Sequence, residues 1–248
     1  MIKSVMIKEE FKKDTSVIKD ATISSFIVEY PKKAINYNTQ QTKQIKNIAN
    51  NPKFEKSMEF DKLVAFIALL FLWPVFIVLA LLISLKMPGP VLFTQKRVGQ
   101  NGTLFSMYKF RTMFVNNSGS TITIKGESRI TELGIFLRKY KIDELPALWN
   151  VLKGEMSLVG PRPDIPGYAD VLEGENRLIL KLKPGITSPA TLKYSYEEEI
   201  LANVNNPQEY NDTVIYPDKV KMNLDYFYTR TFIGDIKIIT NTIFRTDY

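Results

Sequence analysis

Residues 141–163 read KIDELPALWNVLKGEMSLVGPRP, and the rest of the chain can be interpreted from this segment. It opens with two adjacent carboxylates, Asp143 and Glu144, continues with apolar residues at helical spacing, and closes on Gly-Pro-Arg-Pro. Adjacent residues of a helix project about 100° apart, so the two acids cannot do the same work on the same atom. One of them can attack or take a proton while the other binds a metal. Arg162 lies in a turn stiffened by two prolines, which suits a planar cation directed at phosphate.

This stretch resembles the catalytic core of the bacterial sugar transferases, the monotopic polyprenyl-phosphate phosphoglycosyl transferases, in a small form with an N-terminal extension. That family carries an Asp-Glu-Leu-Pro dyad and an Asn-Val-Leu-x-Gly-(Asp/Glu)-Met-Ser-Leu-Val-Gly-Pro-Arg-Pro run, and both are present. Three further family motifs occur in order: Gln-x-Arg-x-Gly from Gln95, Lys-Phe-Arg-(Ser/Thr)-Met from Lys109, and Pro-Gly-Ile-Thr from Pro184. The resemblance covers residues 58–244 and leaves the N-terminal segment aside.

Composition sets wider limits. With 248 residues, of which 45% are hydrophobic, the chain suits one catalytic domain with an appendage. The net charge of +7 points to nucleic acid, anionic lipid or a phosphorylated substrate. Because a long apolar segment is also present and no nucleic-acid-binding module is recognised, the sequence favours lipid and a phosphorylated substrate, and no nucleic acid.

The chain contains no cysteine and no histidine. This excludes disulfides, thiolate nucleophiles, Cys/His zinc sites and Ser-His-Asp triads. Acid-base or covalent chemistry must therefore use carboxylates, Lys, Tyr or hydroxyl groups. A hard cation with oxygen ligands, such as Mg²⁺, is the metal class that fits.

An apolar segment runs from Leu63 to Leu85, which is the length of a membrane helix, with Trp73-Pro74 near its middle. Either the segment spans the membrane with a kink, or it enters, breaks at Trp73-Pro74 and returns to the same side. Lysines and arginine flank both ends, which favours return. The resemblance also implies a re-entrant helix, although the family commonly has Ser-Pro at the breakpoint. A proline here frees a backbone carbonyl that needs a partner away from lipid.

The expected fold is α+β and predominantly helical, a domain on the cytosolic face of the membrane with a re-entrant, Pro-broken membrane helix and interfacial amphipathic helices. Residues 1–57 form an extension, either poorly packed or a helical cap; residues 58–90 form the membrane helix-break-helix; residues 91–248 form the catalytic domain. Residues 115–128 read as a mobile loop that can order on substrate binding, and a charged helix is expected before Lys183.

Residues 217–227 and 232–244 read as amphipathic helices that belong either to the core or to the lipid interface.

The resemblance implies the roles of individual residues. Asp143 is the nucleophile, and Glu144 binds Mg²⁺ on the diphosphate. The expected phosphate- and substrate-binding residues are Lys109, Arg111, Arg138, Arg162, Arg97, Gln95 and Asp235.

The implied reaction transfers a phospho-sugar from a UDP-sugar to a polyprenyl (undecaprenyl) phosphate and releases UMP, at the cytoplasmic face of the bacterial inner membrane. Two alternatives stay open: direct displacement with Asp143 as a base, and a non-enzymatic membrane scaffold. The sugar, the prenyl chain, the pathway and formation of a homo-oligomer are left open by the sequence. Where the family reads Gly-Leu-Ala-Gln, this chain has Ser188-Pro189-Ala190-Thr191-Leu192, a departure at plausible substrate contacts.

Overall fold

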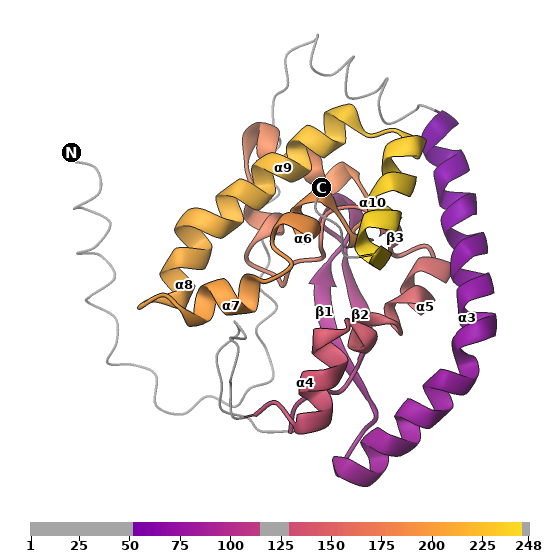
Figure 1. Cartoon of the computed structure of the whole chain (residues 1–248). Coiled ribbons are helices and arrows are strands. Elements are labelled where there is room, and N and C mark those ends of the chain that lie inside the picture. The colour runs from indigo at the N-terminus through magenta and orange to yellow at the C-terminus, as the bar shows by residue number, and fades with distance from the viewer. Residues whose placement is uncertain (1–51, 115–128, 245–248) are drawn as a thin grey trace, which may run out of the picture. The chain divides into compact units, whose positions relative to one another are not determined.

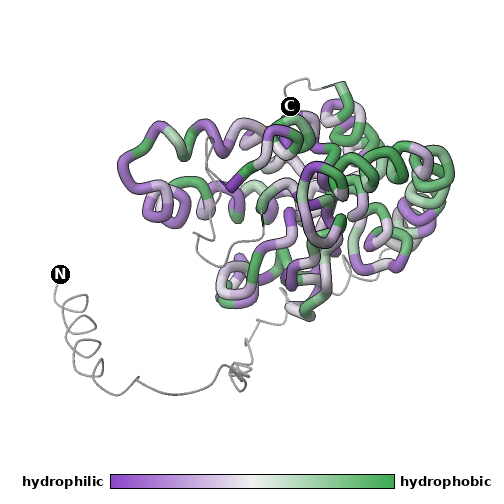
Figure 2. The backbone as a smooth tube through the Cα atoms, turned by 90° about the horizontal axis from the view of Figure 1, so that it is seen from below, coloured by the Kyte–Doolittle hydropathy of each residue, from purple (hydrophilic) through white to green (hydrophobic). Residues whose placement is uncertain are grey.

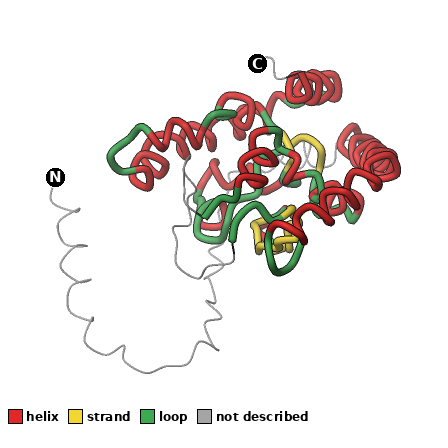
Figure 3. The backbone as a smooth tube through the Cα atoms, turned by 60° about the horizontal axis from the view of Figure 1, so that its bottom comes forward, coloured by secondary structure: helices red, strands yellow, loops and turns green. Residues whose placement is uncertain are grey.

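The structure, a computed structural model, describes residues 52–114 and 129–244. The predicted loop 115–128 and residues 1–51 of the predicted extension lie outside this part of the chain. Helices dominate the described residues, and strands form two small two-stranded sheets (Figure 3). The prediction of an α+β, predominantly helical fold is therefore confirmed.

The first described element is α3, a helix of 35 residues from Pro52 to Lys86. It includes the whole predicted apolar segment and begins earlier than that segment. The helix continues through Pro74 without interruption, so the predicted break at Trp73-Pro74 is wrong at the level of the helix, and its ribbon curves along its length (Figure 1). Pro74 has no N–H, so the carbonyl of Leu70 loses its intrahelical partner, and a helix can bend at such a place without ending.

One face of α3 is buried, and the others are exposed and apolar. The buried face includes Asp61, Ala65, Leu79 and Ile83, at the spacing of one helical stripe. Residues 58–86 form one helix that is long and apolar enough to cross a membrane. Figure 2 colours the described chain by hydropathy, in which such apolar residues are green. Only 11% of the most apolar window of this helix is buried. Exposed large side chains on α3 are Leu63, Phe66, Ile67, Leu70, Phe71, Trp73, Val75, Ile77, Val78, Leu81, Leu82 and Leu85. Such a surface fits a lipid environment better than water.

Strands β1 (Leu92–Val98) and β2 (Leu104–Phe110) form an antiparallel hairpin through the short turn η1 (Gln100–Gly102). Gln95 pairs with Met107, and Arg97 pairs with Phe105. Side chains alternate between the two faces of a strand, so the odd-numbered residues of both strands share one face. That face carries the predicted Gln-x-Arg motif beside Lys109.

The elements around the acid pair are α4 (Glu132–Lys139), η2 (Ile142–Glu144) and α5 (Ala147–Leu152). Strand β3 (Ser157–Val159) pairs in parallel with β4 (Gly185–Thr187). The remaining elements are η3 (Ala169–Val171), η4 (Gly174–Lys181), α6 (Pro189–Lys193), α7 (Glu197–Ala202), α8 (Pro207–Tyr210), η5 (Asn211–Ile215), α9 (Tyr216–Thr229) and α10 (Phe232–Phe244). The charged helix predicted before Lys183 is wound as the 3-10 segments η3 and η4 rather than as an α-helix.

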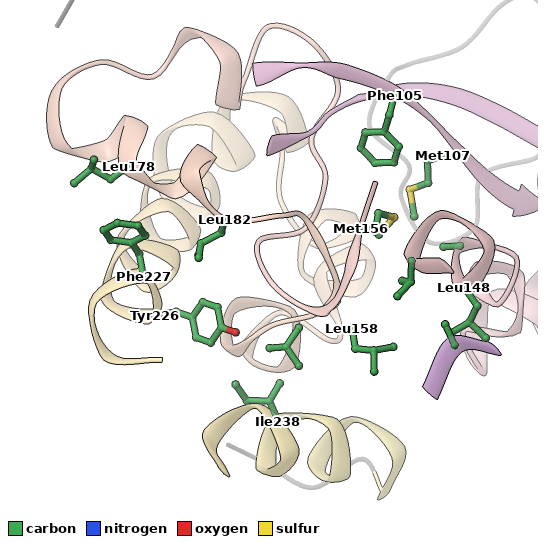
Figure 4. Close-up of a cluster of buried hydrophobic side chains, with 14 residues drawn as sticks. Phe105, Met107, Leu148, Met156, Leu158, Leu178, Leu182, Tyr226, Phe227 and Ile238 are labelled. Atoms are coloured by element: carbon green, nitrogen blue, oxygen red, sulfur yellow. The ribbon is translucent and has the colours of Figure 1, made fainter. Parts of the chain in front are cut away.

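The main core lies between the hairpin, α5, β3 and the C-terminal helices (Figure 4). Phe105 and Met107 come from β2, Leu148 from α5, Leu158 from β3, and Ile238 from α10. The two C-terminal helices differ in their environment. Helix α9 buries Val220, Tyr226 and Phe227, among others, whereas α10 buries Asp235 and Ile238 and exposes Ile233, Ile243 and Phe244.

Asn150 joins α5 to β2. Its side chain is 0% exposed, accepts a hydrogen bond from the Tyr108 N–H at 3.1 Å, and donates to the Ser106 carbonyl at 2.8 Å and to Glu155 at 2.7 Å. Buried polar groups of this kind stabilise a fold only while all partners are paired.

We expect Asn150→Ala to lower the free energy of unfolding by about 3 kcal/mol, because it leaves buried backbone groups of β2 without partners. The matched control is Asn205→Ala, at an exposed position, which should change it by less than about 0.5 kcal/mol. Thermal unfolding of the detergent-solubilised proteins measures both. Equal midpoints for the two variants would contradict the role given to Asn150.

Candidate active site

The acid pair lies in a single 3-10 turn, η2, between α4 and α5. Both acids are buried: Asp143 is 7% exposed and Glu144 is 8% exposed. Lys141, just before them, adopts a left-handed conformation with φ of 57°, which is unfavourable for a residue with a Cβ. Helix α5, which continues from the pair, packs against α3. The acids therefore precede a helix that packs on the apolar helix, and the turn that carries them begins at a strained residue.

Glu144 is held by two cations. Lys109 Nζ lies 2.9 Å from Glu144 Oε1, and Arg162 donates to both carboxylate oxygens, with Nη1 3.2 Å from Oε2. Burial alone would raise the pKa of Glu144, but the charges of Arg162 and Lys109 and the Arg162 hydrogen bond outweigh it and hold the pKa well below its usual value. Glu144 is therefore ionised at neutral pH.

The position of Lys109 follows from the strand period. Phe105, Met107 and Lys109 share one face of β2, so the face that fills the core at one end delivers a cation to Glu144 at the other. Burial lowers the pKa of Lys109, while the neighbouring Glu144 charge opposes this shift. An isolated buried lysine would be costly, and the ion pair compensates for that cost.

Asp143 has a different environment although it is the adjacent residue. Its buried Oδ1 has no hydrogen-bond partner within residues 52–114 and 129–244. Burial and the neighbouring Glu144 charge raise the pKa of Asp143, and Lys109 and Arg138 oppose them. A carboxylate oxygen that is desolvated and not engaged in hydrogen bonds is a suitable nucleophile.

Arg162 is fixed by backbone contacts on both sides of its turn. Gly160 N donates to Thr187 O at 2.9 Å, and Gly185 N donates to Pro161 O at 2.8 Å. The two glycines touch: a Cβ added at Gly185 would lie 2.1 Å from the Gly160 nitrogen. The Gly-Pro-Arg-Pro and Pro-Gly-Ile-Thr motifs thus need glycine because two backbones meet there.

On its other side, the turn is tied to β1. Val98 N donates to Asp164 O at 2.8 Å, and Arg97 Nη1 donates to the Pro163 carbonyl at 3.1 Å. Arg97 Nη2 donates to Gln95 Oε1 at 2.6 Å. Burial and the nearby Arg162 charge lower the pKa of Arg97 to about 10, so it stays protonated at neutral pH. The structure therefore brings Gln95 and Arg97 to the same charged cluster as Arg162.

Arg138 donates a hydrogen bond to Glu198, which lies in the acidic run Glu197-Glu198-Glu199. Lys219 of α9 binds Glu197 through both carboxylate oxygens, at 2.6 and 2.7 Å. Neither the acidic run nor Lys219 is among the site residues that the sequence predicts. One signal was available in the sequence: more cations than acids are predicted near the acid pair, so further acids are needed as their partners.

Two other residues that the sequence predicts to bind substrate form contacts elsewhere in the fold. Arg111 is 5% exposed and donates to the carbonyl oxygens of Met87 and Pro88, just past the end of α3. Asp235 accepts hydrogen bonds from Tyr226 at 2.6 Å and Arg230 at 3.2 Å. These contacts favour an anchoring role for both residues, and their binding of substrate stays a prediction.

The acid pair is compatible with Mg²⁺. Magnesium is commonly bound by one or two carboxylates with substrate phosphates and water completing its coordination. In the described residues no group of three or more acidic, His or Cys side chains is arranged to hold a metal. Glu144 is ionised and can supply one anionic oxygen ligand, with Lys109 and Arg162 sharing that carboxylate in the described arrangement, so the donors present fit such sparse coordination.

Comparison with known proteins gives a family match and individual relatives. A family model described as bacterial sugar transferase matches residues 53–246. The UDP-N-acetylgalactosamine-undecaprenyl-phosphate N-acetylgalactosaminephosphotransferase of Aeromonas hydrophila is 35% identical over 190 residues, covering 74% of this chain and 41% of that relative. The UDP-glucose:undecaprenyl-phosphate glucose-1-phosphate transferase of Xanthomonas campestris pv. campestris is 37% identical over 192 residues, covering 75% of this chain and 37% of that relative.

A third relative is Galactosyl transferase CpsE of Streptococcus agalactiae serotype III, which is 31% identical over 251 residues. That match covers 92% of this chain and 53% of the relative. The chain therefore spans between 37% and 53% of the length of these three relatives. Their names differ in the sugar, so the similarity does not identify which sugar this chain would take.

The opposite environments of the two acids predict opposite effects on stability. The pKa of Asp143 is raised from 3.8, so the stability that its carboxyl contributes falls as pH rises through the window above 3.8. The pKa of Glu144 is lowered, so its contribution is present above its usual value of 4.5 and is lost as pH falls through the lowered pKa. At pH 7 we expect Asp143→Asn to melt at or above the wild-type temperature and Glu144→Gln to lose about 3 kcal/mol. Melting curves between pH 4 and 8 test this; a larger loss for Asp143→Asn than for Glu144→Gln would contradict the assignment.

Proposed function

The chain belongs to the bacterial sugar transferase family, as its motifs predict, and on that premise we propose that it transfers a phospho-sugar from a UDP-sugar to a polyprenyl phosphate. The acceptor would be undecaprenyl phosphate, and UMP would be released. The reaction would take place at the cytoplasmic face of a bacterial inner membrane. It would begin the assembly of a surface polysaccharide or glycoconjugate.

One observation carries this proposal: two adjacent buried acids have opposite environments beside a cluster of cations. Glu144 is neutralised by Lys109 and Arg162, while Asp143 keeps an unengaged oxygen within the described residues. Both proposed substrates are anionic, so attack by a carboxylate requires nearby positive charge. A purely structural pair of acids would not need one member left without a hydrogen bond in a buried position.

The proposed chemistry has two steps. In the first, an Asp143 oxygen attacks the sugar-linked phosphorus, a new P–O bond forms, and the bond to UMP breaks with its electron pair leaving on UMP. In the second, an oxygen of the polyprenyl phosphate attacks the same phosphorus and the Asp143 carboxylate departs. Lys109, Arg162 and Arg138 would stabilise the phosphate charge in both steps.

Glu144 would bind Mg²⁺, with Asp143 close by. The ion would neutralise the diphosphate. In the described arrangement Lys109 and Arg162 occupy the Glu144 oxygens, so they keep the buried carboxylate paired and are themselves in position to contact phosphate.

The proposal includes a re-entrant α3. Both halves of α3 pack against the same domain: Ala65 belongs to the main core, and Leu79 and Ile83 belong to a second cluster with Phe110 and Leu137. If α3 crossed a bilayer, one of its halves would lie near the membrane face opposite the domain and could not pack against that domain. Packing of both halves against one domain supports a helix that returns to the side it entered.

Helix α10 would lie in the lipid interface. Ile233 is 81% exposed and Phe244 is 75% exposed. The ring of Phe232 packs against that of Phe60 in α3 with centroids 5.1 Å apart, so α10 starts beside the membrane helix. Exposed apolar side chains next to a membrane helix support an interfacial position.

We expect Asp143→Asn to lose turnover by about a thousandfold or more, because the amide cannot act as the nucleophile. With a radiolabelled UDP-sugar and no acceptor, the wild-type protein should acquire a denaturation-stable, hydroxylamine-sensitive label. The label should be absent from Asp143→Asn and should disappear when EDTA removes Mg²⁺. The matched control is Asp225→Asn, an exposed acid on α9, which should label and turn over like the wild type.

The alternatives give different results in the same assay. Turnover without a label under any condition would indicate direct displacement with Asp143 as a base. A protein that releases no UMP from any UDP-sugar in a panel, with acceptor present, would be a scaffold and not this enzyme. Labelling that survives EDTA would remove Mg²⁺ from the proposal.

The topology of α3 can be tested with single cysteines, because the chain contains none of its own. Lys62 and Lys86 lie at the two ends of the apolar stretch. Single cysteines at these two positions should both react with an impermeant maleimide in inside-out vesicles. Neither cysteine should react in intact spheroplasts. A cysteine at the exposed Lys221 marks the side of the catalytic domain. If the cysteines at positions 62 and 86 were labelled from opposite sides of the membrane, α3 would span the membrane and would not be re-entrant.

A further inference from the structure

Two neighbouring acids at the start of α7 bind their cations in different ways. Glu197 accepts two hydrogen bonds from Lys219 of α9, one at each carboxylate oxygen, at 2.6 and 2.7 Å. Glu198 accepts a hydrogen bond at Oε1 from Nη2 of Arg138, which belongs to α4. Among the described residues, the first pair therefore engages both oxygens of its acid, and the second pair engages one oxygen and one nitrogen.

The guanidinium of Arg138 has a second donor on the same edge. Nε and Nη2 of an arginine point from one edge of the planar group, and this edge matches two oxygens of a carboxylate or a phosphate. In Arg138, Nη2 donates to Glu198, while the buried Nε has no hydrogen-bond partner within residues 52–114 and 129–244. Buried donors are nearly always paired, so this half-used edge points to a ligand that offers two oxygens.

The edge belongs to the proposed reaction centre. Arg138 lies in the last turn of α4, directly before the turn that carries Asp143. Its positive charge opposes the rise in the pKa of Asp143 that burial causes. Asp143 Oδ1 is also buried and has no partner among the described residues. The site therefore combines an unengaged donor with an unengaged carboxylate oxygen, which is the combination that attack on a phosphoryl group requires.

Glu198 is the more easily displaced of the two acids. Its side chain is 37% exposed, so water screens its pair with Arg138 and the pair contributes little to stability. Lys219 meanwhile fixes Glu197, the first residue of α7, to α9, so the Glu198 side chain can turn toward solvent while the helix stays in place. The helix dipole favours acids in the first turn of α7, but it does not determine that one of them reaches Arg138.

We propose that Glu198 is an exchangeable partner of Arg138, and that the diphosphate of the sugar nucleotide displaces it by binding both Nε and Nη2 of the guanidinium. This inference rests on the proposed function and adds a residue that determines how tightly the site binds its substrate. A phosphate forms two charge-assisted hydrogen bonds along the edge where Glu198 forms one. The displaced carboxylate then becomes hydrated at the surface of α7.

The exchange has a consequence for binding and release. Glu198 is tethered beside Arg138, so it competes with every anion that uses this edge at a high effective concentration. When the phosphate leaves, the carboxylate returns and the partly buried guanidinium is again paired. Glu198 therefore weakens the binding of phosphates to Arg138 and leaves unaffected any ligand that does not reach the edge.

Isothermal titration calorimetry of the full chain in nanodiscs, with Mg²⁺ present, measures UDP binding to the wild type, Glu198→Gln and the matched control Glu173→Gln. We expect Glu198→Gln to bind UDP about threefold more tightly or better, because a neutral amide competes less for Arg138. Glu173→Gln removes the same charge from an exposed position before η4 and should bind UDP like the wild type. Uridine, which has no phosphate, should bind equally to all three proteins.

Two further variants separate exchange from a general loss of negative charge. Glu197→Gln breaks the pair with Lys219, so it should lower the melting temperature and tighten UDP binding less than Glu198→Gln does. Arg138→Lys keeps the charge and removes the edge with two nitrogens, so it should weaken UDP binding by about tenfold. Glu198→Gln itself should melt within about two degrees of the wild type, because its pair is partly exposed.

Three results would overturn the inference: UDP binding by Glu198→Gln that is no tighter than that of the wild type, equal tightening in Glu197→Gln, or wild-type affinity in Arg138→Lys. A fourth is a lower KM of Glu198→Gln for polyprenyl phosphate with UDP binding unchanged, since the edge would then bind the acceptor and not the sugar nucleotide. Failure of the wild type to release UMP from any UDP-sugar would instead refute the proposed function itself.

Discussion

The buried carboxylate of Glu144 is the constraint on which the site depends. A charge in this position is costly unless cations and hydrogen bonds surround it. Its two partners come from different parts of the chain: Lys109 from the hairpin and Arg162 from the turn after β3. The ion pairs therefore join three segments, and each segment is fixed by its own backbone contacts. Neutralising the charge of Glu144 therefore determines how Lys109 and Arg162 are arranged around the acid pair.

That arrangement lets two adjacent acids differ. Glu144 accepts hydrogen bonds from Lys109 and Arg162, whereas Asp143 is desolvated and keeps an oxygen without a described partner. Neighbouring carboxylates with separated pKa values are a recurring way to assign different tasks to identical groups. The left-handed backbone at Lys141 costs energy that a glycine would avoid, and such strain is common where a turn must direct functional side chains.

The apolar helix is in contact with elements of the charged site. Arg111 donates hydrogen bonds to the carbonyl oxygens just past the end of α3, and α5 packs against α3. Gly89 has a φ of 115°, and a Cβ there would lie 2.6 Å from the Arg111 guanidinium, so glycine permits the close approach. These contacts join α3 to the strand and the helix that flank the site. For an enzyme whose proposed acceptor is a lipid phosphate, such contacts would hold the site near the membrane.

The sequence is enough to predict the class of fold, the apolar helix, the acid pair and most of the surrounding cations, because these features depend on local composition and on motifs of fixed spacing. It also indicated that Gln95 and Arg97 belong with Lys109, which the antiparallel register explains. Tertiary structure alone decided which acid is paired and which is left unengaged, because that depends on the burial of Glu144 between residues 35 and 18 positions away in the chain. It likewise decided that Arg111 binds the end of a helix and that Glu198 faces Arg138. Long-range contacts of this kind leave no periodic signal in a sequence, since they arise only when distant segments compensate one another's charge.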